Sequence, residues 1–494
     1  MKRALTIVAI AGLSGAALAL RLWHIDFGLP EFFHPDEPIK AQKALAIAAG
    51  DLNPHYFWHP SFMLYTTAVA VRLFAWNDGP VDPTRVVLIG RVVNATFGAL
   101  TIPLTFLLGR AIAGSAVGLG AAALLTVAPL PVFCSHYLKE DAPLTFWIVA
   151  AAVAALRLTR RGTTRDYIVA GLLCGAAIAT KYTGLLALLL PFLAHRERPG
   201  HEPRQLRWLG FAAMIAFITL TPFAVLDTWQ FARGVGHEGS NVVTGMATSA
   251  LSPLPFLWTF HLRYSIAPGL GWLATALALV GFVWALRQPT ASYRVVTAFV
   301  ALGYTIFENS PYKPPPNFDR YVLPLLPFLA VLAMVGVRAL RRRVPLLAVA
   351  VLAALLIEPT VRSLQLLTTM TPDTRERAAE WLRANLPPGA RIILEGQLVD
   401  DEGHPVVAYA PHLTKANATY VFSLAQRPER LGEFDYAVAS SFMYDRFVRF
   451  GAGDPSAAAF YRTLFARPLA AEFAPPTSSY GFHNPTLRVY RLGP

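Results

Sequence analysis

The sequence predicts a polytopic α-helical membrane protein that ends in a small α/β domain. Of its 494 residues, 54% are hydrophobic and only 15% are charged, whereas soluble globular proteins carry about 25% charged residues. The apolar residues fall in runs of about 17–25, the length that a helix needs to cross a bilayer. These observations exclude a soluble enzyme, a disordered chain and a disulfide scaffold.

The first apolar run, residues 5–20, follows Lys2 and Arg3 and has small residues near its end. This pattern is typical of a signal peptide, but the many later runs favour an uncleaved first helix. Residues 62–76 are apolar but contain Arg72, so we interpret them as an interfacial helix and predict eleven spans in total. The other ten runs centre on residues 86–108, 116–132, 144–158, 167–179, 184–193, 208–226, 270–286, 295–307, 322–339 and 344–357.

The basic residues predict the orientation. With the N-terminus in the cytoplasm, the cytoplasmic segments hold seventeen Lys and Arg, while the first outer loop, residues 23–85, holds seven acids and four bases. Basic residues concentrate on the cytoplasmic side, and counting residues 62–76 as a span would invert every later loop. The net charge of +13 therefore reflects membrane topology and indicates no nucleic-acid partner. We therefore expect residues 371–494 on the outer face of the membrane.

The chain changes character near residue 370, so residues 1–370 are the predicted transmembrane domain and residues 371–494 the predicted outer domain. Residues 373–386 predict an amphipathic helix, with Ala378, Trp381, Leu382 and Leu386 on one face. The Pro-Pro-Gly sequence at 387–389 ends this helix. Residues 391–394 and 434–439 are then predicted to be strands.

The polar clusters that topology leaves unexplained all fall on the outer side. Asp36 and Glu37 stand between two prolines, which favour extended or turn backbone. A carboxylate fixed there could accept a proton from an attacking hydroxyl or hold a divalent cation. It could equally be a solvated loop pair or a helix cap.

Glu140 and Asp141 begin a span close to the bilayer, where acids either face a cavity or cap the helix. Lys181 and Tyr182 separate two short apolar runs, which suits a bound phosphate or a snorkelling side chain. Arg320 and Tyr321 open another span, and Arg can grip phosphate bidentately. The remaining candidate substrate-binding residues of this side are His34, His59 and Lys139.

Other ligand sites have weaker support. His55 and His59 would share a helical face, but Pro54 and Pro60 interrupt a helix and no third ligand is near, so zinc remains an open alternative. Cys134 and Cys174 lie in or beside apolar runs and fit small packing residues.

Several motifs, in order along the chain, resemble those of the GT-C superfamily of polyprenyl-phosphate-sugar-dependent glycosyltransferases. They are His-Pro-Asp-Glu at 34–37, Trp-His-Pro at 58–60, Arg91 to Gly98, Glu-Asp-Ala-Pro-Leu at 140–144, Ala179 to Gly184, Arg320 to Pro327, and Ala-Ala-Glu-Trp at 378–381 followed by Leu-Pro-Pro-Gly at 386–389. The chain is most similar to the protein O-mannosyltransferases and the lipid A aminoarabinose transferases. Pro38 and Ser61 depart from the family pattern and leave the acceptor class open.

The resemblance implies an active site on the periplasmic face of a bacterial inner membrane, where a sugar passes from a polyprenyl-phosphate donor to a hydroxyl acceptor on a protein, lipid or glycan. A single displacement of the lipid phosphate by the acceptor hydroxyl would invert the anomeric configuration. Asp36 would be the base with Glu37 beside it, and Asp141 the second-loop acid with Glu140 as neighbour. Lys181 and Arg320 would contact the lipid phosphate. The main alternative is a transporter or flippase of a lipid-linked substrate, which would place polar groups near the midplane of broken helices. A scaffold protein with inert loop acids is the other alternative.

Overall fold

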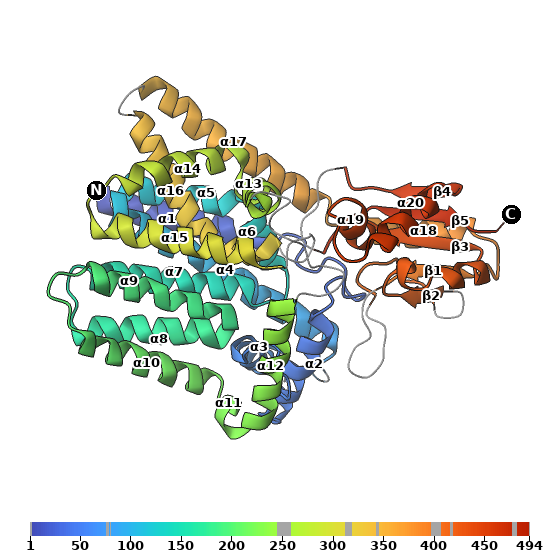
Figure 1. Cartoon of the computed structure of the whole chain (residues 1–494), viewed down its shortest axis with the longest axis horizontal. Helices are drawn as coiled ribbons and strands as arrows, with labels where there is room; N and C mark the ends of the chain where they lie inside the picture. Colours follow the sequence, from blue (N-terminus) through green and yellow to red (C-terminus); the bar gives the residue numbers. More distant parts are fainter. Residues whose placement is uncertain are drawn as a thin grey trace.

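The computed structural model describes residues 2–75, 79, 81–244, 258–311, 319–341, 345–396, 407–414, 418–476 and 482–493. A helical bundle and an α/β unit lie end to end along the long axis of the molecule (Figure 1). The N-terminus lies at the end of the bundle that is remote from the α/β unit.

The bundle contains long helices and several short connecting turns. In chain order these are α1 (Lys2–Leu22), α2 (Glu37–Ala49), α3 (Phe62–Phe74), α4 (Pro83–Ala113), α5 (Ser115–Val127), α6 (Pro129–Phe133), η2 (Cys134–His136), α7 (Asp141–Leu158), α8 (Thr164–Thr180), η3 (Tyr182–Leu188), α9 (Leu189–Glu197), η4 (Pro203–Gln205), α10 (Leu206–Leu220), α11 (Phe223–Leu226), α12 (Thr228–Thr244), η6 (Leu262–Ile266), α13 (Ala267–Leu270), α14 (Trp272–Leu286), α15 (Ala291–Asn309), η7 (Asp319–Leu325), α16 (Leu326–Arg341) and α17 (Pro345–Thr368).

Five helical segments of the described chain are long and apolar enough to cross a membrane, or up to seven if two bent pairs each count as one span. Every predicted run contains a helix, but several helices are shorter than a full crossing, such as α8 with 17 residues and α10 with 15. The predicted count of eleven is therefore not established. The expected interfacial helix is α3, which has only 13 residues.

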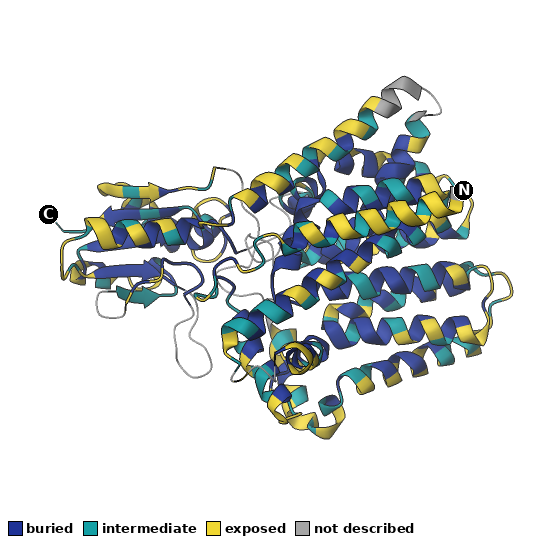
Figure 2. Cartoon of the chain, turned by 180° about the vertical axis from the view of Figure 1, so that it is seen from behind, coloured by how far each residue is buried: buried dark blue, intermediate teal, exposed yellow. Residues whose placement is uncertain are grey.

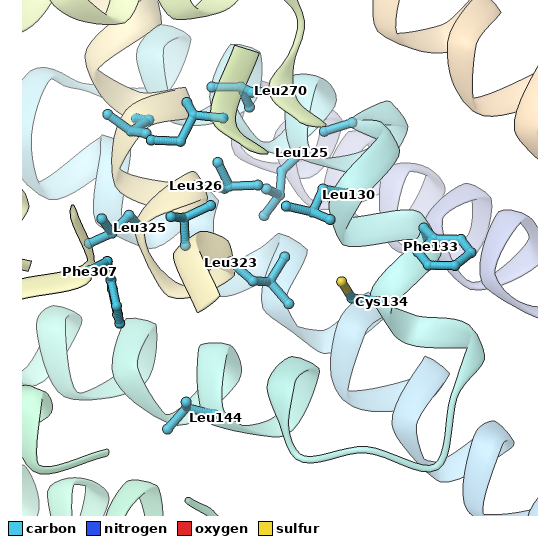
Figure 3. Packing of buried hydrophobic residues seen from close by; sticks show 14 of the residues in the cluster. Leu125, Leu130, Phe133, Cys134, Leu144, Leu270, Phe307, Leu323, Leu325 and Leu326 are labelled. Carbon is cyan, nitrogen blue, oxygen red and sulfur yellow. The ribbon is translucent and has the colours of Figure 1, made fainter. Parts of the chain in front are cut away.

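Backbone breaks shape the inner part of the bundle. Helix α5 and the following segment Pro129–His136 meet at 58°, and Leu262–Leu270 meets α14 at 106°. Pro129 cannot donate a backbone hydrogen bond, and Gly271 has a φ of 107°, which glycine adopts without strain. These bends bring short segments into the apolar core, where Leu130, Leu270 and Leu323 lie together (Figure 3).

Burial follows the same architecture. Buried residues fill the middle of the bundle, whereas exposed residues follow the outer faces of the peripheral helices (Figure 2). The exposed residues include large apolar side chains such as Phe211, Leu279 and Ile357. An apolar outer surface of this kind is what a helix bundle in lipid requires.

The α/β unit begins with α18 (Thr374–Asn385), which Asp373 and Glu376 cap reciprocally. Its five-stranded sheet has the order β2-β1-β3-β5-β4. The strands are β1 (Ile392–Glu395), β2 (Ala418–Val421), β3 (Tyr436–Ser440), β4 (Leu469–Phe473) and β5 (Leu487–Arg491), and the helices among them are η8 (Leu424–Gln426), η9 (Pro428–Glu433), α19 (Ser441–Val448) and α20 (Pro455–Phe465). Strands β2, β1 and β3 are parallel, while β5 is antiparallel to β3 and β4. The predicted helix and both predicted strands are found, each within two residues of its expected start.

Candidate active site

Within the first outer loop, Asp36 is the residue that immediately precedes α2. Asp36 has helical backbone angles, and its N–H donates to Nδ1 of His34 over 3.1 Å. Pro38 lies in the first turn of α2, where its missing N–H costs nothing. The Asp36 side chain is 32% exposed and forms an ion pair with Lys139. The loop therefore presents a partly accessible carboxylate beside a buried ammonium group.

Glu37, the neighbouring acid, has different surroundings. Its side chain is fully buried, and its oxygens accept from Nε and Nη2 of Arg91 at 2.8 and 2.6 Å. One of them also accepts from the N–H of Leu138 at 2.9 Å. Arg91 donates further to the carbonyls of Ile25 and Phe27. Glu37 thus ties the first loop to α4 and to the second loop, and it is not brought into the accessible cluster with Asp36.

Glu140 lies in the second loop between three basic side chains. Lys40 of α2 forms an ion pair with one oxygen, and Nζ of Lys139 lies 3.5 Å from the other. Nε2 of His59 lies 3.9 Å from the same oxygen as Lys139. The side chains of Lys40, Lys139 and Glu140 are at most 2% exposed. Predicted residues from two loops therefore meet in one buried network, with Lys40 added by α2.

Asp141 joins two other spans to this network. Its Oδ1 lies 2.7 Å from Nζ of Lys181, and its Oδ2 lies 3.2 Å from Nε of Arg320. The ring of Tyr321 lies beneath both cations, 4.7 Å from the ammonium and 5.8 Å from the guanidinium. Lys181 and Arg320, which the resemblance assigns to one lipid phosphate, therefore lie on either side of the same carboxylate. Asp141 also begins α7, so its charge stabilises that helix as well.

The charges of the cluster control its protonation. Burial opposes ionisation of Asp36, but Lys139, His34, Lys40 and Arg320 outweigh this effect and hold the pKa of its carboxyl well below the ordinary value. Burial and its cationic neighbours likewise compete at Glu140, whose pKa is also lowered. Burial lowers the pKa of Lys40 to about 8 and that of His59 to about 3. At neutral pH the acids are ionised and His59 is neutral.

The other predicted residues surround this cluster. The buried His34 ring lies 4.8 Å from that of Tyr137, and Tyr182 donates its hydroxyl to the carbonyl of Phe57 over 2.8 Å. Nε2 of His55 lies 3.6 Å from Oδ2 of Asp51, whereas His59 lies beside Glu140. In the chain outside the gaps, no group of three His, Cys, Asp or Glu is arranged to hold a metal ion. Cys134 and Cys174 are buried free thiols. The proline-rich stretch before Arg320, residues 313–317, lies outside the described chain.

Sequence reasoning missed Lys40, Arg91 and Asp319. Lys40 stands three residues after Glu37, a helical spacing that turns it toward the same side. Arg91 is an arginine within an apolar helix, which by itself signals a buried partner. Asp319 is buried and accepts from the backbone N–H of Arg320 over 2.9 Å. It lines a small cavity together with His34, Lys139 and Asp141.

Comparison with known proteins places this geometry in context. Residues 59–226 match the family model described as dolichyl-phosphate-mannose-protein mannosyltransferase. Over the whole chain, the fold is similar to that of ArnT from Cupriavidus metallidurans bound to undecaprenyl phosphate, with a TM-score of 0.57, 15% identity and coverage of 100% of this chain and 99% of that chain. The chain has the GT-C fold.

Two further likenesses agree with the GT-C fold. An Archaeoglobus fulgidus oligosaccharyltransferase tethered to an acceptor peptide aligns with a TM-score of 0.55 and 12% identity, over 97% of this chain and 74% of that one. An undecaprenyl phosphate-alpha-4-amino-4-deoxy-L-arabinose arabinosyl transferase from Enterobacter sp. (strain 638) is 26% identical over 327 residues, which are 61% of this chain and 54% of that protein. The chain spans about half the length of this relative.

Proposed function

We propose that this GT-C protein is a membrane glycosyltransferase that moves a sugar from a polyprenyl-phosphate donor to a hydroxyl acceptor on the periplasmic face of a bacterial inner membrane. The observation that carries the proposal is the convergence of four cations and three carboxylates, one of them partly exposed, from separate helices and loops. These groups are Asp36, Lys40, Lys139, Glu140, Asp141, Lys181 and Arg320. Structural neighbours bound to undecaprenyl phosphate or a dolichol-phosphate support the donor class.

The cluster is suited to receive a lipid phosphate. Lys181 follows the end of α8, Arg320 lies at the start of η7, and both pair with the carboxylate of Asp141. A phosphate that enters here therefore meets two cations already held side by side. Preorganised cations stabilise charge as it develops on a leaving phosphate without reorganising at the moment of reaction. In this proposal Asp141 orients the two cations, and Glu140 does the same for Lys40 and Lys139.

Asp36 is the proposed base. The acceptor oxygen attacks the anomeric carbon, its proton passes to the Asp36 carboxylate, and the bond from the anomeric carbon to the phosphate oxygen breaks with its electron pair on the phosphate. A single displacement inverts the anomeric configuration. The cations that keep Asp36 ionised also weaken it as a base, but the negative charge of a bound phosphate offsets part of their field. Donor binding therefore raises the proton affinity of Asp36 when the base is needed.

The remaining residues have supporting roles in this scheme. Glu37 anchors the first loop through Arg91, and His34 holds the backbone of Asp36. His59 lies beside Glu140, and Tyr182 donates its hydroxyl to the carbonyl of Phe57. Both residues therefore lie where residues 55–59 meet the cluster. A divalent cation has no proposed place, because each acid of the cluster already faces a Lys or Arg side chain, and no step uses one.

The proposal is tested by incubating the purified protein with a synthetic polyprenyl-phosphate sugar and candidate hydroxyl acceptors. Release of polyprenyl phosphate together with an acceptor product of inverted configuration is expected, with Asp36→Asn as the inactive control. Donor that stays intact with every acceptor class, or a product of retained configuration, would contradict the mechanism. If the wild-type protein, reconstituted in lipid vesicles, moves intact donor from one leaflet to the other, the transporter alternative is favoured.

A further inference from the structure

Residues 482–486, the segment just before β5, lie beside the charged cluster that contains Asp36 and Lys139. Phe482 is only 2% exposed, and its ring lies 4.4 Å from that of His34. It lines the same small cavity as Lys139 and Arg320. Residues more than 150 positions apart along the chain therefore meet beside the proposed base.

Arg375 of α18 holds this segment in place. Its guanidinium donates to the carbonyl of Phe482 over 2.6 Å and to both oxygens of Asp373 over 2.8 Å. It also lies 3.7 Å above the ring of Phe33 and donates to the Phe33 carbonyl over 3.4 Å, and it donates to the carbonyl of Ala408. One fully buried side chain thus ties the α/β unit, the Phe482 segment and the first outer loop together.

Two contacts extend from Phe482 to the charged residues. Its N–H donates to the hydroxyl oxygen of Tyr137 over 3.1 Å, two residues before Lys139. Its ring packs on His34, whose Nδ1 accepts the N–H of Asp36 over 3.1 Å. Phe482 is therefore linked to Asp36 through His34, and it contacts the second outer loop at Tyr137, close to Lys139.

We propose that Arg375 and Phe482 are positioning residues, through which the C-terminal α/β unit holds the loop that carries Asp36. This inference rests on the proposed function, in which Asp36 is the base. Neither residue is placed against substrate. Their effect is to keep His34, and with it the backbone of Asp36, in one position relative to Lys139.

Phe450 offers a matched control for this proposal. It is another buried phenylalanine of the α/β unit, 6% exposed, and it packs on Phe260 and Tyr264 of the bundle at ring distances of 5.7 and 5.4 Å. Phe450→Ala therefore removes an apolar contact between the same two parts of the chain, but one in which neither His34 nor Asp36 takes part.

The first experiment measures backbone hydrogen exchange in the full-length protein and does not depend on transfer activity. Phe482→Ala should speed exchange in the peptide that contains Asp36 at least 10-fold, because the His34 ring loses its support. Phe450→Ala should leave that peptide unchanged. Equal acceleration by both variants, or none by Phe482→Ala, would overturn the proposal. If Phe482→Ala does not fold, Arg375→Lys is measured by the same criterion.

The second experiment measures kinetics against pH. Phe482→Ala should lower kcat about 10–100-fold, the typical effect of a misplaced catalytic group, with the donor KM within about twofold. The acid limb of the rate profile should move to higher pH, because Asp36 leaves the groups that face it: Lys139, His34, Lys40 and Arg320. Phe482→Leu, which keeps most of the apolar volume, should recover most of kcat. An unchanged acid limb would contradict positioning, whereas a wild type without transfer contradicts the proposed function instead.

Discussion

The acidic cluster at the end of the bundle and a single buried carboxyl group in the C-terminal sheet are held in opposite ways. At the end of the bundle, Asp36, Glu140 and Asp141 each face a Lys or Arg side chain from another segment. In the C-terminal sheet, Glu395 accepts from the N–H groups of Leu424 and Ser440 at 3.1 and 2.7 Å and from the hydroxyl of Tyr461. Within the described chain, no ion pair involves Glu395.

The pKa values record this difference. Cations outweigh burial at Asp36 and hold its pKa well below the ordinary value, whereas burial dominates at Glu395 and raises its pKa to about 7. Neutral donors tie adjacent strands and η8 together and leave the Glu395 carboxyl no open side. At the end of the bundle, by contrast, the carboxylates pair with cations from several helices, and Asp36 is partly exposed. A charged ligand can therefore replace one partner of such an ion pair. The contrast distinguishes a structural carboxyl from a proposed reaction centre.

Asp36→Asn should have the largest effect and sharpen the contrast most. The amide has nearly the same shape but cannot accept the proton of the acceptor, so transfer should fall about 10²–10⁴-fold. Thermal stability should change little, since Asp36 is partly exposed and Lys139 keeps Glu140 as a partner. Transfer assays paired with melting curves measure both. Near-normal turnover in Asp36→Asn, with Asp141→Asn inactive, would move the base to the second loop.

Glu37→Gln should affect stability before chemistry. It leaves the fully buried guanidinium of Arg91 without its carboxylate, and breaking a buried pair typically costs about 3–5 kcal/mol. A large fall in the melting temperature of the detergent-solubilised protein is expected, with residual transfer in the folded fraction. Unchanged melting with complete loss of transfer would instead indicate that Glu37 takes a direct part in the reaction.

Glu395 should make stability depend on pH. Its carboxyl has a folded pKa of about 7 against the ordinary 4.5, so the folded state holds the proton more tightly. The resulting stabilisation is fully present below pH 4.5 and is lost as the pH rises through 7, about 3 kcal/mol in all. The wild-type melting temperature should therefore fall relative to that of Glu395→Gln between pH 5 and 8. Parallel curves would contradict the raised pKa.

Lys181→Met should have the smallest effect and act mainly on donor binding. The thioether keeps the length of the side chain but removes one charge-assisted contact to phosphate, so the donor KM should rise about 10-fold. Inhibition by free polyprenyl phosphate should weaken in parallel. Arg157→Met is a suitable control, because Arg157 pairs with Asp166 at the end of α7 remote from the cluster. Equal effects of the two substitutions would argue against a phosphate site at Lys181.

Much of the site could be predicted because its residues follow rules that act locally. Charged groups at the ends of apolar runs must lie near the membrane surface, and the order of the runs assigned His34, Lys139, Lys181 and Arg320 to one side. The different roles of Asp36 and Glu37 could not be predicted in this way. They are neighbours with the same chemistry, and only the approach of Arg91 from α4 buries one of them.

The sequence by itself determined a membrane-embedded helical bundle followed by an α/β unit, since apolar run length, charge placement and turn residues act over a few positions at a time. It also identified most of the charged residues that meet at the end of the bundle. Only the tertiary structure decided which acid pairs with which base, that Lys40 joins them, and that Arg375 and Phe482 support the loop of Asp36. Those contacts join residues from 40 to 448 positions apart, and ion pairing and packing at such separations depend on how whole elements come together in space.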